Sequence, residues 1–180
     1  MPLTVAVTGG IGAGKSEALK AFARRGVPTL SADEVVHRLI ADDPEVRQAL
    51  EGRFGTTDRA EIAAVVFADG DQLAWLESLL HPRVRRVTGE WLAGLDAEIA
   101  VTEIPLLFET GGEARFDVVV VITAPEDVRA ARSPQSRDTR SRRLIPDEEK
   151  VARADFAYVN DGSLDDLDAF VDRVLERLQA

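Results

Sequence analysis

The sequence predicts an α/β fold built on a parallel sheet of about five strands, with helices on both faces. Two observations predict it. Short apolar runs rich in β-branched residues alternate with segments of helical period, which is the order of β-α-β units. One run, FDVVVVIT at residues 116–123, is too continuously apolar for an edge strand and is typical of a parallel strand buried on both faces. We expect a single domain over residues 1–180.

The first elements follow from local patterns. The run LTVAVT at residues 3–8 ends in glycines and predicts a central strand, and a helical pattern follows from Lys15 to about Arg25. VPTLSAD predicts a second short strand that ends at Asp33, before a helix that starts with EVVHRLI.

Helical period dominates residues 34–95, which predicts a helical insertion on the sheet. The main breaks expected in it are Asp43-Pro44, Gly55 and His81-Pro82.

Strand character returns at residues 98–104 and again at 116–123. A helix is expected from about Pro125 to Arg132, then a polar, arginine-rich lid over about 130–146. Pro146 and the acidic residues after it mark the start of another helix. The chain then continues as a fifth strand at residues 156–160, a turn, and a helix from about Leu164.

Composition excludes several classes of protein. The chain has 32 acidic and 22 basic residues, a net charge of -10, which argues against nucleic acid or an anionic membrane as a partner. It contains no cysteine, so disulfides and thiolate metal sites are excluded. No apolar stretch approaches the roughly 20 residues of a membrane span, and a cytoplasmic location is the expectation. The oligomeric state is left open, and a monomer is compatible with the sequence.

The strongest functional signal is a complete Walker A motif between the first strand and the first helix. Its glycines let successive backbone amides point inward at a helix start, which makes a cradle for phosphate. Lys15 would neutralise the β and γ oxygens of ATP, and the Ser16 hydroxyl is of the kind that binds Mg²⁺. The alternative is a glycine-rich turn that binds nothing. The residues expected to bind ATP are Gly10, Ile11, Gly12, Ala13, Gly14, Lys15, Ser16 and the backbone of Glu17.

Other nucleotide-binding classes lack support. The single asparagine, Asn160, is not part of the Asn-Lys-x-Asp motif that reads guanine, and no LSGGQ-like transporter signature occurs. A small chain with a helical insertion favours a small-molecule kinase.

Further segments carry a resemblance to one family. They are TGGIGAGKS, SAD at 31–33, IAAVVFAD at 62–69, LESLLHPRV at 76–84, PLLFE at 105–109 and EEKVARADFAYVNDGS at 148–163. In this order the sequence resembles the dephospho-coenzyme A kinases over nearly the whole chain. The resemblance implies a P-loop kinase fold, an acceptor-binding insertion, and transfer of the ATP γ-phosphoryl group to the ribose 3′-hydroxyl of dephospho-coenzyme A.

The resemblance also implies roles for single residues. Asp33 would orient the acceptor hydroxyl and receive its proton; an aspartate there can also cap the next helix, and the two roles can coexist. Pro105 and Leu106 would contact the acceptor, or else pack in the core. His81 is expected to contact the acceptor or to start a helix and not to transfer a proton. Glu103 and Glu109 could assist metal-bound water, but solvated carboxylates are the simpler interpretation.

Two further expectations concern the later part of the chain. Arginines are enriched between residues 129 and 143, and Arg137 and Arg140 are the preferred lid residues to stabilise transition-state charge; a solvated basic face is the alternative. Asn160 is expected near adenine by resemblance, although a plain Asn-Asp-Gly turn explains the same residues.

Three departures from the family pattern stand out. Glu17 replaces a usual threonine, the lid is short, and the insertion is trimmed near Gly55 to Arg59. Two other functions stay open at this point: a P-loop kinase for another small alcohol such as a nucleoside, and a non-catalytic nucleotide-binding regulator.

Overall fold

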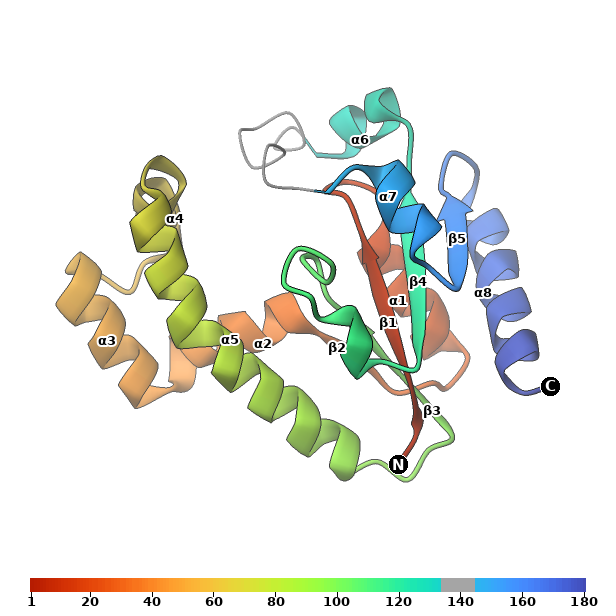
Figure 1. The fold of residues 1–180 in the computed structure, drawn as a ribbon, viewed down its shortest axis with the longest axis horizontal. Helices are drawn as coiled ribbons and strands as arrows, with labels where there is room; N and C mark the ends of the chain where they lie inside the picture. Colours follow the sequence, from red (N-terminus) through yellow and green to blue (C-terminus); the bar gives the residue numbers. More distant parts are fainter. Residues whose placement is uncertain (134–144) are drawn as a thin grey trace. The chain divides into compact units, whose positions relative to one another are not determined.

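The computed structural model describes residues 1–133 and 145–180 and divides them into two compact units (Figure 1). The first unit joins Met1–Ser31 to Leu95–Ala180, and the second is Ala32–Gly94. The second unit nearly coincides with the residues 34–95 expected for the helical insertion.

Five strands form one parallel sheet in the described part of the first unit. They are β1 (Leu3–Gly9), β2 (Thr29–Ser31), β3 (Ile99–Glu103), β4 (Val118–Thr123) and β5 (Phe156–Val159). Their order is β2-β3-β1-β4-β5, so β1 lies in the centre with Val5 paired to Val101 on one side and to Val118 on the other. All five strands therefore end at one edge of the sheet, and the predicted α/β architecture is confirmed.

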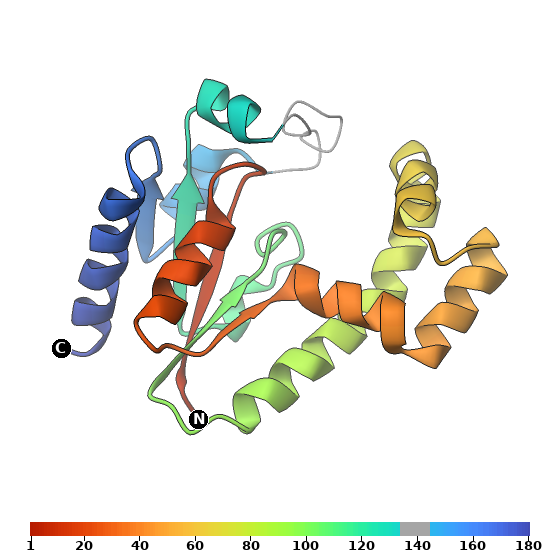
Figure 2. The same ribbon diagram turned by 180° about the vertical axis from the view of Figure 1, so that it is seen from behind.

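Different helices of the first unit cover the two faces of the sheet. They are α1 (Lys15–Arg24), the 3₁₀ turn η1 (Glu113–Arg115), α6 (Glu126–Arg132), α7 (Asp147–Ala152) and α8 (Leu164–Leu178). The helices α1 and α8 lie side by side over one face, as Figure 2 shows. The helix α7 and the segment after β3 lie over the other face, in front of the sheet in Figure 1.

The core follows from this layering. The face under α1 and α8 buries valines of β1 and β4 against Phe22, Leu167 and Val171. The opposite face buries Leu107 and Phe108 of the segment after β3. The side chains of β1 are buried on both faces, as its apolar sequence predicts.

The second unit consists of four helices. They are α2 (Ala32–Asp42), α3 (Pro44–Phe54), α4 (Arg59–Ala68) and α5 (Gly70–Ala93). Aspartate side chains cap the last three, because Asp43, Asp58 and Asp69 each accept hydrogen bonds from the two backbone amides at the helix start.

Two predicted boundaries in this region were wrong. The second strand ends at Ser31 instead of Asp33, because the helix already begins at Ala32. His81-Pro82 does not break the chain, since Pro82 lies inside α5. Proline removes one helical hydrogen bond there, but Leu80 and Leu92 are buried and α5 packs on α2 and α4, which holds the helix together.

None of the helices in residues 1–133 and 145–180 combines the length and apolar character that crossing a membrane requires.

Candidate functional site

The loop between β1 and α1 has the geometry of an anion cradle. Gly12 and Gly14 have φ values of 76° and 100°, a left-handed conformation that residues with side chains rarely adopt. The Ala13 amide donates to the Gly10 carbonyl at 3.3 Å and closes a turn. Gly14 is the cap residue of α1, so the loop leads directly into the helix start, where free backbone amides and the helix dipole favour a negative charge.

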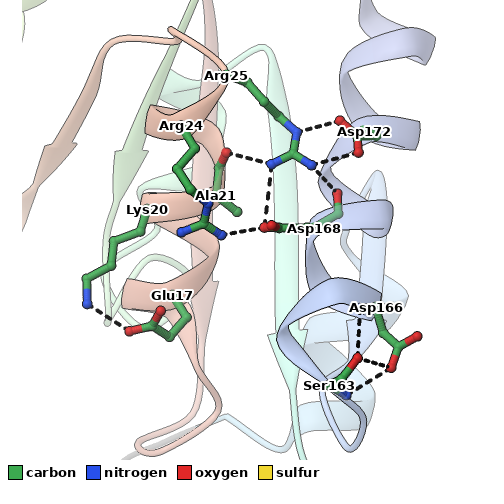
Figure 3. Close-up of polar contacts among 9 residues, drawn as sticks. All are labelled: Glu17, Lys20, Ala21, Arg24, Arg25, Ser163, Asp166, Asp168 and Asp172. Atoms are coloured by element: carbon green, nitrogen blue, oxygen red, sulfur yellow. Dashed lines mark hydrogen bonds and ion pairs between the residues drawn. The ribbon is translucent and has the colours of Figure 1, made fainter.

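The polar side chains at the start of α1 point in different directions. Lys15 reaches back over the loop, and its Nζ donates to the Gly10 carbonyl at 3.0 Å. Ser16 is exposed. The Glu17 carboxylate forms an ion pair with Lys20 Nζ at 2.8 Å, one turn further along the helix (Figure 3). Of these three side chains, Lys15 is the one whose charge is held against the loop.

Neighbouring elements pack so closely on the loop that side chains at its glycines would collide. A Cβ atom on Gly12 would lie 2.8 Å from the Arg129 carbonyl oxygen of α6. On the other side, Asn160 Nδ2 donates to the Ala13 carbonyl at 2.9 Å. The predicted glycines are therefore required both for turning and for space.

A buried carboxylate lies at the same edge of the sheet. Glu103 ends β3, pairs in register with Val7 of β1, and is only 4% exposed. Ser31, the last residue of β2, donates its hydroxyl to Glu103 Oε2 at 3.1 Å. The interpretation of Glu103 as a solvated carboxylate was therefore wrong. The signal available in the sequence was its position as the acidic end of an apolar strand.

Glu109 is likewise not solvated. Its side chain is 10% exposed, and its Oε1 atom lies 2.9 Å from Nζ of the fully buried Lys150. The two atoms are close enough for an ion pair but are not aligned as a hydrogen bond. Glu109 Oε1 also accepts a hydrogen bond from the Ile145 amide at 3.1 Å. Sequence reasoning missed this pair, although Lys150 is one of only three lysines in the chain.

The remaining predicted residues lie in different parts of the molecule. Pro105 and Leu106 follow β3 in the first unit and are half-buried. Asp33 and His81 belong to the second unit: Asp33 is exposed in the first turn of α2 and does not cap it, and His81 is half-buried within α5. Arg137 and Arg140 lie outside the described residues. Within the described ranges, no three His, Cys, Asp or Glu side chains gather in an arrangement that could hold a metal ion.

A parallel sheet whose central strand runs through a glycine loop into a helix, with a lysine folded over that loop, is the architecture of the P-loop nucleotide-binding proteins, the class that includes the P-loop kinases. A family model described as dephospho-CoA kinase matches residues 3–166. The chain belongs to the dephospho-CoA kinase family. The fold and the ATP-dependent kinase activity expected from the sequence are thereby confirmed.

Individual relatives agree with this assignment. A dephospho-CoA kinase from Mesorhizobium japonicum is 39% identical, over 98% of this chain and 97% of its own length. A crystal structure of a Thermus thermophilus protein superposes with a TM-score of 0.84 at 35% identity, and 98% of each chain is covered. A dephospho-CoA kinase structure from Campylobacter jejuni gives a TM-score of 0.72 at 26% identity, with 99% of this chain and 98% of that chain covered.

Proposed function

We propose that this kinase binds the phosphates of ATP in the loop at residues 9–16 and passes the γ-phosphoryl group to the ribose 3′-hydroxyl of dephospho-CoA, the last step of coenzyme A synthesis, in the cytoplasm. The observation that carries the proposal is the Gly12–Gly14 turn at the start of α1, with Lys15 held over it. Phosphoryl transfer depends mainly on positioning and on neutralising charge, and this loop offers both.

Each part of the loop has a separate task. Backbone amides from Gly10 to Glu17 would bind the phosphate oxygens, and the Lys15 ammonium would neutralise the β and γ groups. The Glu17 carboxylate stays with Lys20, so this residue contributes its backbone. On the argument from sequence alone, Arg137 and Arg140 would neutralise charge on the transferring group.

The residues near the loop fit Mg²⁺. The exposed Ser16 hydroxyl and the Glu103 carboxylate are the oxygen donors that this ion prefers. Few protein ligands are needed, because Mg²⁺ takes most of its ligands from phosphate oxygens and water. Ser16 would hold the ion directly, and Glu103, oriented by Ser31, would hold water around it. When bound, Mg²⁺ withdraws charge from the phosphate oxygens.

The acceptor is assigned to residues that follow strand ends and to the helical unit. Asp33 comes two residues after the end of β2, and as an exposed carboxylate it can accept the proton of the ribose hydroxyl. Pro105 and Leu106 follow β3 and offer apolar surface to the pantetheine part, and His81 would contribute a polar contact.

The test is to mix the purified protein with Mg·ATP and dephospho-CoA and to look for coenzyme A by mass spectrometry. Lys15→Met should lower kcat/KM by about 10³-fold, because the charge over the loop is lost. Arg24→Met, at the exposed far end of the same helix, is the matched control and should keep normal activity. Asp33→Asn should lower kcat by about 100-fold or more, whereas Asp42→Asn at the other end of α2 should not.

Other outcomes would favour the competing functions. Turnover of ATP with a nucleoside but not with dephospho-CoA would indicate a different acceptor. Tight ATP binding without any turnover would indicate a nucleotide-binding regulator.

A further inference from the structure

Asn160 is fixed by three different elements of the first unit. Its backbone amide donates to the carbonyl of Thr123, the last residue of β4, at 2.7 Å. Its backbone carbonyl accepts a hydrogen bond from Arg132 NH1, at the end of α6, at 3.1 Å. Its side-chain Nδ2 donates to the Ala13 carbonyl of the phosphate loop at 2.9 Å. Only 4% of Asn160 is exposed, so the carboxamide is held in one place against the loop.

The hydrogen bond to Ala13 determines the direction of the next amide. In a planar trans peptide the carbonyl and the following N–H point to opposite sides. Because Asn160 holds the Ala13 carbonyl on its own side, the Gly14 N–H must point away from Asn160. That amide belongs to the residue that caps α1, and backbone amides at a helix start favour the binding of an anion.

The space around Gly14 supports the same conclusion. A Cβ atom on Gly14 would lie 2.1 Å from Asn160 Nδ2 and 3.8 Å from Arg132 NH1. Gly14 also has a φ of 100°, so its peptide cannot easily relax when a side chain is added. Asn160 therefore fills the volume directly behind the Ala13–Gly14 peptide.

We propose that Asn160 is a positioning residue for the polyphosphate group: it locks the Ala13–Gly14 peptide with its amide toward the phosphates, and it does not act by contact with the base. This role rests on the proposed function only in that the ligand of the loop is a polyphosphate. The expectation from family resemblance, a place near adenine, gives a different result in the test below.

The test uses tripolyphosphate, which has the phosphate chain but no base, beside ATP in calorimetric titrations with Mg²⁺. Asn160→Ala removes the donor and should weaken both ligands equally, by about tenfold. Asn160→Asp replaces the donor by a negative charge next to the loop and should weaken both by about 100-fold. Asp161→Ala is the control, because Asp161 is exposed in the same turn; its affinities should be unchanged.

The outcomes separate the two roles. Loss of ATP affinity with unchanged tripolyphosphate affinity would overturn the proposal in favour of a base contact. Unchanged affinity for both ligands would overturn it as well. A protein whose Asn160 variants weaken both ligands, but which makes no coenzyme A, would contradict the proposed function and leave the positioning role standing.

A second measurement changes the other partner of this contact, first with Asn160 present and then without it. Gly14→Ala adds a methyl group against Nδ2, so it should disturb the loop through both strain and collision. In an Asn160→Ala background only the strain remains, and the loss of tripolyphosphate affinity caused by Gly14→Ala should be at least fivefold smaller. If the loss of tripolyphosphate affinity in the double variant equals the product of the losses in the two single variants, to within a factor of two, the two residues are not coupled and the proposal is overturned.

Discussion

Ion pairs join the elements that cover each face of the sheet, but the pairs on one face are exposed to solvent and the pair on the other is buried. On one face, exposed ion pairs join α1 to α8: Arg24 pairs with Asp168, and Arg25 pairs with Asp172 and donates to the Asp168 carbonyl (Figure 3). On the other face, Lys150 of α7 pairs with Glu109 of the segment after β3, with side chains 0% and 10% exposed.

The difference between exposed and buried ion pairs shows where a charged side chain matters most for the stability of the fold. Water and salt screen the Arg–Asp pairs, so α1 and α8 are joined mainly by the apolar contacts of Phe22, Leu167 and Val171. Lys150 and Glu109 have no such screening, and each is needed to neutralise the other. The hydrogen bond from the Ile145 amide to Glu109 extends this buried pair to the segment two residues before α7.

The largest effect is expected from Lys150→Met. The substitution leaves Glu109 buried without its counter-charge, so the free energy of unfolding should fall by about 3–5 kcal/mol. Urea denaturation measures the loss, and Lys20→Met, at an exposed lysine, is the control. Adding Glu109→Gln to Lys150→Met should recover part of the loss. A loss below about 1 kcal/mol in the single variant would contradict the contrast between the two faces.

Arg25→Met tests the exposed face and should cost only about 1 kcal/mol, because the guanidinium is partly in water. This loss in the free energy of unfolding should become smaller at high salt, because salt then screens the ion pair in the unmodified chain and little is left for the substitution to remove. Comparing urea midpoints at low and high salt checks both statements. Activity should not change, and a large drop in ATP affinity would show that this face also supports the phosphate loop.

A smaller effect is expected at Asp117, which is exposed but well hydrogen-bonded. The backbone amide and the hydroxyl of Thr4 donate to its Oδ2 at 2.8 and 2.7 Å, and they hold the pKa of Asp117 below its usual 3.8. A lowered pKa gives stability that is present above about pH 4 and is lost as the pH falls through the folded-state value. Asp117→Asn should therefore cost about 0.5 kcal/mol at pH 7, and acid-denaturation curves should show the difference fading as the pH falls below about 4 and through the folded-state pKa.

The smallest effect is expected from Glu17→Thr. The carboxylate pairs with Lys20 on the exposed side of α1, so ATP affinity should change by no more than about twofold. Titration calorimetry measures the ATP affinity. Glu17→Gln removes the negative charge but keeps the size of the side chain, so it separates the effect of charge from that of shape. A tenfold gain in both variants would show that the carboxylate repels the phosphates despite its ion pair.

Much of the fold was readable from local patterns. The valine run of β4 and the apolar run of β1 identified buried parallel strands, and the complete glycine-rich motif located the loop. The start of α8 at Leu164 was also predicted; Ser163 and Asp166 form a capping box there. The wrong boundaries have local causes. No glycine or proline separates β2 from α2, so the sequence does not mark where the strand ends. Pro82 was interpreted as a helix break, but α5 continues past it because the helix packs against α2 and α4.

The site was less readable, because its remaining parts depend on contacts between distant segments. No spacing rule brings Glu109 to Lys150, or Ser31 to Glu103, so acids that looked solvated proved to be buried. Asn160 was recognised, but its hydrogen bond to Ala13 follows only from the sheet that places the end of β5 beside the loop.

The Asn160–Ala13 hydrogen bond spans 147 positions of the chain. During synthesis, Ala13 is made long before its partner exists, and at about 5–20 residues per second the interval is about 7–30 s. A nascent chain that ends before β5 has the whole glycine motif but lacks the Asn160 carboxamide that holds its Ala13–Gly14 peptide. Firm nucleotide binding would then mark the completion of the first unit, and nucleotide could stabilise the finished protein without trapping its shorter precursors.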